Sequence, residues 1–514
     1  DTSNAIIPNL VYGDGKSNCL LPGGNSNVGS LTVEANAEVN INKFSTLTIN
    51  NNLNVNSDGL LLVRSNGGSN GAGHGNLIVN GNASGNIRYD LYIEDYNKTS
   101  LITVPVTGLK FGEVASANNN LYQNPQNTAQ KVFGPYVDAV YKAWDTNLNA
   151  NEALNPGIGY RVASKAGNDR LLHFTGPLTN TDVTLSFNTL NSDGWHLVGN
   201  PYTSGIDLKK FIDLNINNGN LDNLASAIYG WDADESDITG SKWTIITKND
   251  QKFIPPGQGF FVKPSANKSL LFETSMQAVE NGAGFIQKNV NTDIQSFYLT
   301  LSDGTSKAAT KIYINNEASL GIDQGFDVIH KDNIESFGIF TTAADNSSNT
   351  PLAVQTIPET EIEKASIPLS INADNGINLT IRAEEININN DLELFLEDLS
   401  NGALMNLKKE ELKTTFQNIT TNTRFLLHFE NKSLSLDKLK YQPKIYKEGC
   451  ELTIYDNDFK NSFISISDIN GRIVFSKIFK NTYKKIINTE NLNKGIYIIN
   501  IQNSVNSFSS KIIL

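Results

Sequence analysis

Residues 31–62 read LTVEANAEVNINKFSTLTINNNLNVNSDGLLL, and their spacing of apolar residues is typical of β-structure. Its apolar residues form pairs separated by one residue, and the pairs recur every 6–8 positions with mostly Asn, Gly, Ser or Asp between them. The pairs are Leu31/Val33, Val39/Ile41, Leu47/Ile49, Leu53/Val55 and Leu60/Leu62. Side chains at positions i and i+2 lie on the same face of a strand. Short, regular strands of this kind indicate a stacked β-solenoid or a β-meander, and the pattern leaves both open.

The same rhythm extends along most of the 514-residue chain. Hydrophobic residues make up 39% of the sequence and mostly stand in short runs between polar segments. These segments are rich in Asn and Gly, which favour turns because both residues tolerate a positive φ. We therefore predict an all-β, multidomain protein. At about 100–200 residues per domain, the length allows roughly three to five units.

A diverged duplication is the second feature of the sequence. Three landmarks recur in the same order: a strand with proline, an aromatic-Trp-Asp segment and a Pro-Gly-x-Gly-aromatic turn. The matched segments are 101–106 with 197–202, 141–145 with 229–232, and 155–160 with 255–260. Pro-Gly before an aromatic strand is turn chemistry, so each copy is expected to form a β-domain. One helix is expected between landmarks of the second copy, near residues 208–214.

Four domains follow from these patterns. Period-2 alternation in the strand-rich segment before Glu430 predicts half-buried antiparallel strands, as in a β-sandwich, with a short helical connection near residues 407–412. The polar residues after Glu430 form the predicted linker. The predicted domains are 1–92 (short-rung β-repeats), 93–285 (duplicated β-domain), 286–432 (β-sandwich) and 438–514 (a small immunoglobulin-like C-terminal β-sandwich).

Charge is distributed unevenly along the chain. The formal net charge is −12, which argues against a nucleic-acid-binding protein because such a protein carries a basic face. Residues 437–514 contain 12 Lys and Arg against 7 Asp and Glu, a balance of +5, so the remaining residues carry −17. The C-terminal block is thus electrostatically distinct from the rest and is expected to have a different task.

Cysteine usage and the start of the chain add little. Cys19 and Cys450 stand 431 positions apart, which neither favours a disulfide nor matches the spacing of a metal site. No apolar run approaches the roughly 18–20 residues of a membrane-spanning helix. The sequence begins with Asp1 instead of Met, and we expect a signal peptide to have been removed before it.

Three motifs close the chain. Residues 466–474 read ISDINGRIV, residues 492–501 read LNKGIYIINI, and residues 511–514 read KIIL. Asn470-Gly471 is a tight-turn signal, and a final strand can offer an edge for pairing with a receptor. In this order and spacing, the motifs resemble the type A C-terminal sorting domain of type IX secretion substrates from the Bacteroidetes.

The resemblance covers roughly the last 75 residues and assigns a sorting-signal role to particular positions. They are Asp468, Gly471, Arg472, Leu492, Gly495, Tyr497 and Lys511. The start of the block, residues 444–447, lacks the family's Pro-Asn-Pro motif. The resemblance implies export across the outer membrane to the cell surface or the medium. It also implies three partners: an outer-membrane shuttle barrel, a translocon barrel and a sortase-like peptidase.

No catalytic motif is found in the sequence. The five histidines, His74, His173, His196, His330 and His428, make no metal-binding or catalytic spacing. His173 and His428 stand in apolar contexts that are typical of strand residues. Neither G-x-S-x-G nor H-E-x-x-H occurs. We therefore expect neither an enzyme nor a cofactor.

One acidic segment is a calcium candidate. Asp232, Asp234 and Asp237 stand close together after Trp231, and carboxylates in a loop can surround a hard cation with oxygen ligands. The segment lacks the central Gly and the distal Glu of an EF-hand, so a solvated acidic loop is the alternative.

The part of the chain ahead of the sorting motifs is the exported cargo, or passenger, and three hypotheses for its function remain open. The first is an adhesin-like or structural protein of the cell surface. The second is a carbohydrate-binding protein that captures surface glycans, and the third is an unrecognised polysaccharide hydrolase. The candidate residues for stacking on sugars are Trp144, Trp195, Trp231 and Trp243, although such rings more often anchor a core. An exposed aromatic platform would favour sugar binding, and a cleft with converging carboxylates would favour hydrolysis.

Overall fold

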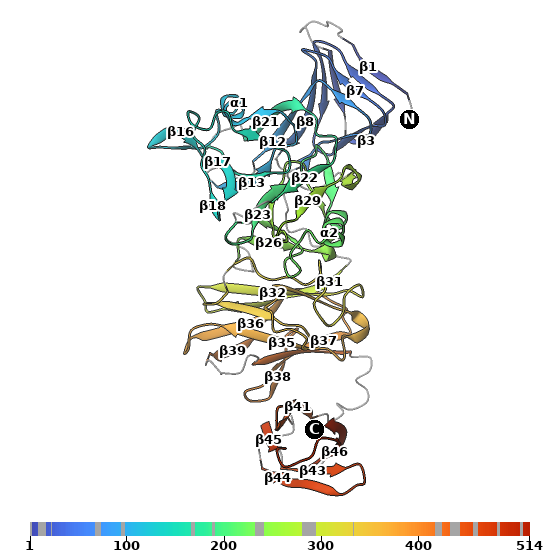
Figure 1. Ribbon diagram of the computed structural model, residues 1–514, viewed down its shortest axis with the longest axis vertical. Coiled ribbons are helices and arrows are strands. Elements are labelled where there is room, and N and C mark those ends of the chain that lie inside the picture. Colours follow the sequence, from blue (N-terminus) through green and yellow to red (C-terminus); the bar gives the residue numbers. More distant parts are fainter. Residues whose placement is uncertain are drawn as a thin grey trace. The chain divides into compact units, whose positions relative to one another are not determined.

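Strands build nearly all of this protein. The computed structural model describes residues 3–8, 17–21, 23–66, 73–93, 98–165, 170–187, 191–231, 241–279, 294–332, 334–416, 424–431, 443–455, 461–480, 484–503 and 507–514. Among these residues the α-helices are α1 (Phe111–Ala117) and α2 (Leu208–Asn217), and Figure 1 shows strands from one end of the chain to the other. The prediction of an all-β, multidomain chain is confirmed.

The chain divides into two compact units. The first unit comprises residues 1–294, 322–333 and 352–356, and the second comprises residues 295–321, 334–351 and 357–514. Two short segments from the later part of the chain thus belong to the first unit. The four domain boundaries drawn from the sequence stay a prediction.

The first unit begins with short strands that pair with one another in parallel, except for the pair at Gly73–His74, which is antiparallel. They are β1 (Ala5–Ile7), β2 (Ser17–Leu21), β3 (Gly24–Val28), β4 (Leu31–Val33), β5 (Ala37–Ile41), β6 (Ser45–Ile49), β7 (Leu53–Val55), β8 (Leu60–Asn66), β9 (Gly73–His74), β10 (Asn76–Val79), β11 (Ala83–Ser84) and β12 (Asn86–Tyr92). Three sheets form, in the orders β1-β4-β7-β11, β10-β6-β3 and β2-β5-β8-β12. Each strand of these sheets pairs with one that lies three or four strands away in the chain. This is the pairing of a solenoid with three faces.

The apolar pairs of the sequence fill the solenoid interior. Leu31 and Val33 lie directly beside Leu53 and Val55 in parallel register, and each of the four side chains is at most 4% exposed. A meander would pair neighbouring strands antiparallel, so the parallel register decides between the two predicted forms. The backbone turns sharply at Gly85, where φ is +81° and a Cβ atom would lie 1.9 Å from the Val55 carbonyl oxygen.

The duplicated region follows the solenoid. Its first copy contains β13 (Thr99–Thr103), β14 (Leu109–Lys110), β15 (Gln123–Asn124), β16 (Asn127–Lys131), β17 (Phe133–Val137), β18 (Val140–Tyr141), β19 (Ala153–Leu154), β20 (Gly159–Ala163) and β21 (Leu171–Pro177). Its second copy contains β22 (Val183–Ser186), β23 (His196–Gly199), β24 (Gly205–Asp207), β25 (Ile228–Trp231), β26 (Trp243–Ile246), β27 (Phe253–Ile254), β28 (Gly259–Val262), β29 (Ser269–Phe272) and β30 (Gln277–Ala278). Strand β21 also extends the last solenoid sheet by pairing antiparallel with β12.

Each copy has an antiparallel four-stranded sheet with equivalent order. The orders are β13-β20-β17-β18 and β23-β28-β25-β26. The sequence match of Trp144 with Trp231 is nevertheless shifted by one strand. Trp144 follows the fourth strand of its sheet, and its backbone N–H donates to the Phe133 carbonyl at 2.8 Å. Trp231, in contrast, is the last residue of the third strand of the other sheet. Trp243 lies on β26, the fourth strand of the second sheet, and is therefore the topological counterpart of Trp144. The sequence match pointed to Trp231 instead, because an aromatic-Trp-Asp motif does not specify the strand on which it lies.

Helix α2 confirms the helix expected near residues 208–214. Asp207 caps its first turn by accepting a hydrogen bond from the Lys210 N–H at 3.1 Å. Leu208, Phe211 and Ile212 are fully buried, and the Phe211 ring stacks on Phe272 of β29 with a centroid distance of 4.9 Å. The helix therefore closes the core of the second copy on one side.

The second unit begins with a β-sandwich. Its strands are β31 (Gln295–Ser302), β32 (Lys307–Ile314), β33 (Gly338–Thr341), β35 (Ser366–Asn372), β36 (Asn378–Asn387), β37 (Leu392–Asp398), β38 (Ala403–Asn406), β39 (Leu412–Thr415) and β40 (Phe425–Asn431). Strand β34 (Val354–Ile357) lies in the same stretch of sequence, but its residues 354–356 belong to the first unit. One sheet contains β32, β31, β36 and β39 in that order, and the other has the order β33-β35-β40-β37-β38. The helical connection expected at residues 407–412 is wrong, because a turn at 407–409 leads into β39.

The last strands form a separate C-terminal module, defined here as residues 443–514. Its strands are β41 (Lys444–Glu448), β42 (Glu451–Tyr455), β43 (Ser462–Asp468), β44 (Ile473–Phe479), β45 (Lys484–Asn488), β46 (Ile496–Gln502) and β47 (Ser507–Ile513). They form two sheets, β41-β42-β45 and β44-β43-β46-β47. Within the described residues these strands pair only with one another, and they enclose their own core around Ile454, Ile464, Ile499 and Ile501.

Candidate functional site

The hairpin between β43 and β44 is built around one carboxylate. Asp468 Oδ1 accepts hydrogen bonds from the N–H groups of Asn470 and Arg472, both at 3.0 Å, and Oδ2 accepts one from Arg472 Nε at 3.2 Å. The backbone N–H of Arg472 is the main reason that the pKa of Asp468 is lowered. Gly471 takes the positive φ, +83°, that the turn requires. The sequence motif at these three positions is therefore a local folding device.

The entry to β46 is fixed by Tyr497. This side chain is 7% exposed, and its hydroxyl donates to the Asn493 carbonyl at 2.8 Å. Leu492, which precedes this loop, packs on the module core. Gly495 exchanges two backbone hydrogen bonds with Leu514, both at 3.0 Å, so the last residue of the chain is held in the sheet. A Cβ atom at Gly495 would meet Tyr497 only at 3.8 Å, so steric hindrance does not explain this glycine.

The outer side of the sheet β44-β43-β46-β47 is unusually apolar. Six large side chains on it are 41–67% exposed: Phe463, Ile473, Ile478, Ile496, Ile498 and Ile513. Direct cross-strand pairs, such as Phe463 with Ile478 and Ile496 with Ile513, place them on one face. Lys511 lies on the same face opposite Ile498. We call these six residues the outer apolar face, and exposed clusters of this kind mark interaction surfaces.

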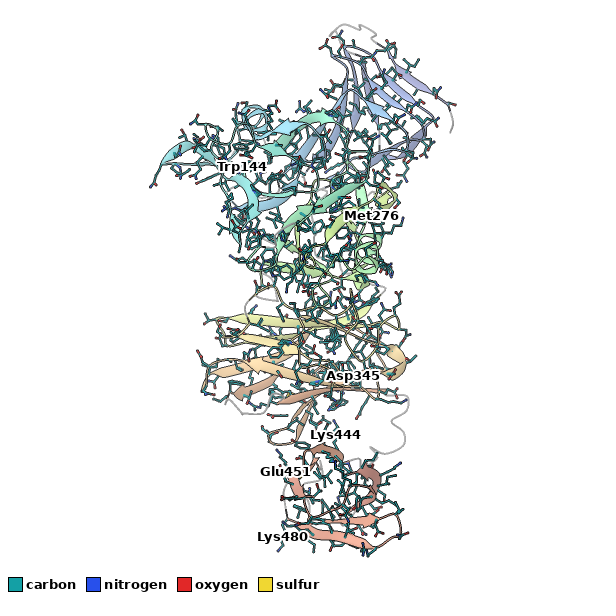
Figure 2. The ribbon with its side chains drawn as sticks, viewed as in Figure 1. Trp144, Met276, Asp345, Lys444, Glu451 and Lys480 are labelled. Carbon is teal, nitrogen blue, oxygen red and sulfur yellow. The ribbon has the colours of Figure 1, made fainter. Side chains whose placement is uncertain are left out.

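The module also has an open edge. Strand β47 lies at the end of its sheet, and it contains Lys511. An edge strand presents unpaired backbone groups to which another strand can be added. The seven predicted sorting-signal residues thus lie in two places, the β43–β44 turn and the β46–β47 hairpin with its approach. Figure 2 shows the side chains of the module, with Glu451 on β42 and Lys480 after β44 labelled.

The first strand of the module contacts the preceding sandwich through a buried carboxylate. Lys444 Nζ lies 2.9 Å from Glu397 Oε2 and 2.7 Å from His428 Nε2, and the same Glu397 oxygen lies 2.7 Å from His428 Nε2. Glu397 is only 1% exposed. Burial lowers the pKa of Lys444, although Glu397 opposes this effect. His428 lies on strand β40, as expected of a strand residue, and its ring is part of a polar cluster.

Two of the four tryptophans belong to packed aromatic clusters. The Trp144 ring lies 5.3 Å from Phe111 and 5.8 Å from Tyr160 between ring centroids, and Figure 2 labels it in the first copy. Trp195 is 7% exposed and contacts Tyr229. These rings are core anchors.

The other two tryptophans are half-buried, as Trp144 also is. Trp231 and Trp243 meet edge to face with centroids 5.0 Å apart. Lys331 Nζ lies 4.7 Å from the Trp243 centroid and 4.4 Å from that of Phe261, and Lys242 lies 5.9 Å from that of Trp231. Cations therefore occupy positions over rings that were candidates for stacking on sugars.

His173 lies on strand β21, as expected, but its side chain joins a polar cluster. Its Nδ1 lies 2.7 Å from Oδ1 of Asp90, a carboxylate that is 1% exposed. Arg88 Nε donates to the same oxygen at 2.7 Å. Burial raises the pKa of Asp90, but the hydrogen bonds from His173 and Arg88 outweigh it, so the pKa is lowered. In the sequence, the only sign of this cluster is that Arg88 and Asp90 are two residues apart and so lie on the same face of β12. Their partner His173 lies on β21, 85 residues after Arg88 and 83 residues after Asp90.

The His173 ring lines a cavity of about 400 Å³. Helix α1, the segment before it and the strands β12 and β21 surround this space. The lining residues are Asn86, Thr107, Gly108, Leu109, Glu113, Val114, Ala117, His173, Thr175, Gly176 and Pro177. Glu113 is the single carboxylate among these residues, so the described lining does not provide the pair of carboxylates that a retaining or inverting glycosidase uses.

Several other sequence candidates are placed only in part. Asp232, Asp234 and Asp237 lie outside the described residues. Among the described residues, no group of three or more metal-ligating side chains comes together. Cys19 and Cys450 are free thiols. None of the helices in the described ranges is long and apolar enough to cross a membrane.

Comparison with known families assigns both parts of the chain. Residues 2–429 match the family described as "Domain of unknown function (DUF8693)". The chain belongs to this family. Residues 450–514 of this DUF8693 protein match the "Secretion system C-terminal sorting domain". The protein is thus a type IX secretion substrate that is exported across the outer membrane to the cell surface or the medium, as the closing motifs predict.

The similarity of this chain to solved structures is weak. No curated protein matches the chain. One similar structure is a DUF3244 family protein with an immunoglobulin-like β-sandwich fold from Bacteroides vulgatus ATCC 8482, at 16% identity, 14% coverage of this chain, 82% of that chain and a TM-score of 0.14. Another is the BSP domain of a biofilm-associated protein, at 9% identity, 83% and 91% coverage and a TM-score of 0.17. At these scores neither likeness supports an inference.

Proposed function

We propose that this protein is an adhesin-like component of the cell surface, and that its passenger, residues 1–437, binds rather than catalyses. The observation that carries the proposal is the separate C-terminal module. A protein with a complete folded module for export is expected to act outside the cell. Three successive β-built parts precede this module, and stacked and sandwiched β-domains commonly display binding surfaces.

The outer apolar face and the β47 edge support specific partners in the export machinery. We infer that an outer-membrane shuttle barrel and a translocon barrel bind the module there, and that a sortase-like peptidase then separates it from the passenger. Apolar contact gives such a complex its affinity, and strand addition at β47 gives it a defined register.

Removal of the module tests the export part of the proposal. A chain that ends at residue 437 should stay in the periplasm, whereas the full chain should be accessible to protease added outside the cell. The double variant Ile496→Ser/Ile498→Ser should also reduce surface protein, because it removes two side chains of the outer apolar face. The control is Thr184→Ser, at an exposed position of strand β22 outside the module. Normal surface display of the truncated chain would contradict the proposal.

Glycans are the second candidate target of the passenger. The cavity beside His173 favours them over a protein surface because it is concave and lined by both polar and apolar groups. Wild-type cells and cells that lack the protein can be compared for adhesion to glycan-coated surfaces. Equal adhesion of the two strains would exclude glycan capture. We also propose that the protein works without a cofactor, so a calorimetric titration with Ca²⁺ should give no binding heat.

A further inference from the structure

The cavity of the first unit has one wall from a strand pair and another from a helix. Asn86 and Thr175 lie on the paired strands β12 and β21, and Glu113 lies on α1. Asn118, just after α1, joins the two walls: its side chain accepts from the His173 N–H at 2.7 Å and donates to the His173 carbonyl at 3.1 Å. The helix is therefore fixed over the strand that carries the cavity-lining histidine.

Two charged side chains of β12, Asp90 and Arg88, hold the His173 ring in place. Asp90 Oδ1 lies 2.7 Å from His173 Nδ1, and Arg88 Nη2 lies 2.7 Å from the same ring nitrogen. Arg64 Nε adds a longer contact of 3.8 Å to Asp90. A buried carboxylate with this set of partners fixes ring orientation, as a supporting carboxylate does for many functional histidines. The ring is thus preorganised in the cavity wall before any ligand arrives.

The lining suits a ligand rich in hydroxyl groups. A hydroxyl group both donates and accepts hydrogen bonds, and the wall offers both capacities through the Asn86 amide, the Thr175 hydroxyl and the Glu113 carboxylate. Leu109 and Pro177 add apolar surface that C–H groups can contact. The volume of about 400 Å³ lies near the lower end of small-molecule sites, which span roughly 300–1,000 Å³.

We propose that this cavity is a binding site for a single terminal sugar residue of a surface glycan, with His173, Thr175, Glu113 and Asn86 as its polar contacts. The inference rests on the proposed adhesin function and names its site. Asp90 and Arg88 act as positioning residues, since they reach the ligand only through His173.

The partly exposed aromatic cluster is the competing site for a glycan. There, Lys331 lies over Trp243 and Phe261, and Arg161 lies over Tyr141 at 4.5 Å, so protein cations already engage these rings. A sugar would have to displace these contacts or use other parts of the rings. The cavity offers open space without such a displacement, and it is therefore the favoured site.

A printed glycan array that carries neutral, N-acetylated and acidic terminal sugars tests the proposal with the full chain. The methyl glycoside of the best-bound terminal sugar is then titrated by calorimetry. His173→Ala and Thr175→Val should each weaken binding by about tenfold or more, the loss of about one good hydrogen bond to a ligand. Thr184→Val, an identical change at an exposed strand position outside the cavity, should bind like the wild type. Thermal unfolding verifies that every variant is folded.

The outcomes separate the two proposals. Wild-type binding that both cavity variants retain overturns the sugar site but leaves glycan adhesion standing. Binding that is lost in Trp243→Ala and kept in His173→Ala moves the site to the aromatic cluster and also overturns this inference. A wild-type array without signal overturns both the site and glycan capture. Asp90→Asn should weaken binding less than His173→Ala, because it leaves the ring in place and removes only the carboxylate that orients it. In the same calorimetric titrations, a loss in Asp90→Asn as large as that in His173→Ala would overturn the positioning role.

Discussion

Single residues show how buried charge is used in this protein. Asp90 carries the clearest case, because a carboxylate that is 1% exposed is compensated by Arg88 and His173. Its pKa is lowered in the folded state, so it binds a proton less readily there than in the unfolded chain. The resulting stability is present above the unfolded carboxyl pKa of about 3.9 and is lost as the pH falls through the lower, folded value.

The Asp90→Asn variant should therefore lose the part of the free energy of unfolding that the ionised Asp90 carboxylate contributes at neutral pH. We expect the free energy of unfolding at pH 7 to fall by about 2–4 kcal/mol, because the variant leaves two basic groups beside a neutral amide. Urea titrations at pH 7 and near pH 3 measure the effect, and the difference between variant and wild type should shrink at the lower pH. Asp58→Asn, at an exposed turn of the solenoid, is the control. A pH-independent difference would show that Asp90 acts by shape alone.

Tyr497 offers a test at the same scale in the C-terminal module. The Tyr497→Phe variant keeps the ring in the core and removes only the hydroxyl that donates to Asn493. We expect the module to lose about 1 kcal/mol of stability, the usual net value of one hydrogen bond. Calorimetry of the full chain measures the change in the unfolding transition of the module. Tyr446→Phe, at a side chain that is 41% exposed, should leave that transition unchanged.

At the scale of elements, the solenoid depends on close backbone approach at its corners. At Gly85 the φ of +81° and the Val55 carbonyl together leave no room for a Cβ atom. Gly85→Ala should therefore cost about 2–4 kcal/mol, measured by urea unfolding of the first unit. Gly23→Ala separates the two causes, because Gly23 has a φ of +103° but open space around it. An equally large loss in both variants would place the whole effect in the backbone conformation.

The elements also show what a sequence can and cannot predict. Burial alternates within a strand, so pairs such as Leu31/Val33 predict rungs from local information alone. The partner of Leu31 is Leu53, 22 positions later and parallel, and nothing local distinguishes this register from a meander. The tight turn at Asp468 was predictable because its hydrogen bonds reach only two to four residues.

Long-range clusters were beyond sequence reasoning for the same reason. His173 meets Asp90 only because β21 pairs with β12, and that antiparallel pair joins strands from different predicted domains. The polar cluster of Glu397, His428 and Lys444 likewise draws on three separate strands, β37, β40 and β41. Each histidine stood among apolar neighbours in sequence, and its charged partners lay across a sheet or beyond it.

At the scale of the whole molecule, separate cores predict separate unfolding. The C-terminal module encloses its own apolar core, and the sandwich before it encloses another around Phe297, Leu394 and Leu427. The polar contacts of Lys444 with Glu397 and His428 link the two, and a single polar cluster couples domains far less than a shared core does. A chain of this size with several cores is not expected to unfold in one two-state step.

Differential scanning calorimetry of the full chain should therefore resolve more than one transition. The chain that ends at residue 437 should lose one of them. The transitions of the first unit should stay within about 2 °C, whereas that of the sandwich should fall, because the truncation removes Lys444 from the buried Glu397. Lys444→Ala in the full chain should shift the module transition without removing it, since it breaks the contact with Glu397 but leaves the module core complete. A single transition that moves as a whole on truncation would mean that the module and its passenger fold as one cooperative body, and a detachable export module would then have no physical basis.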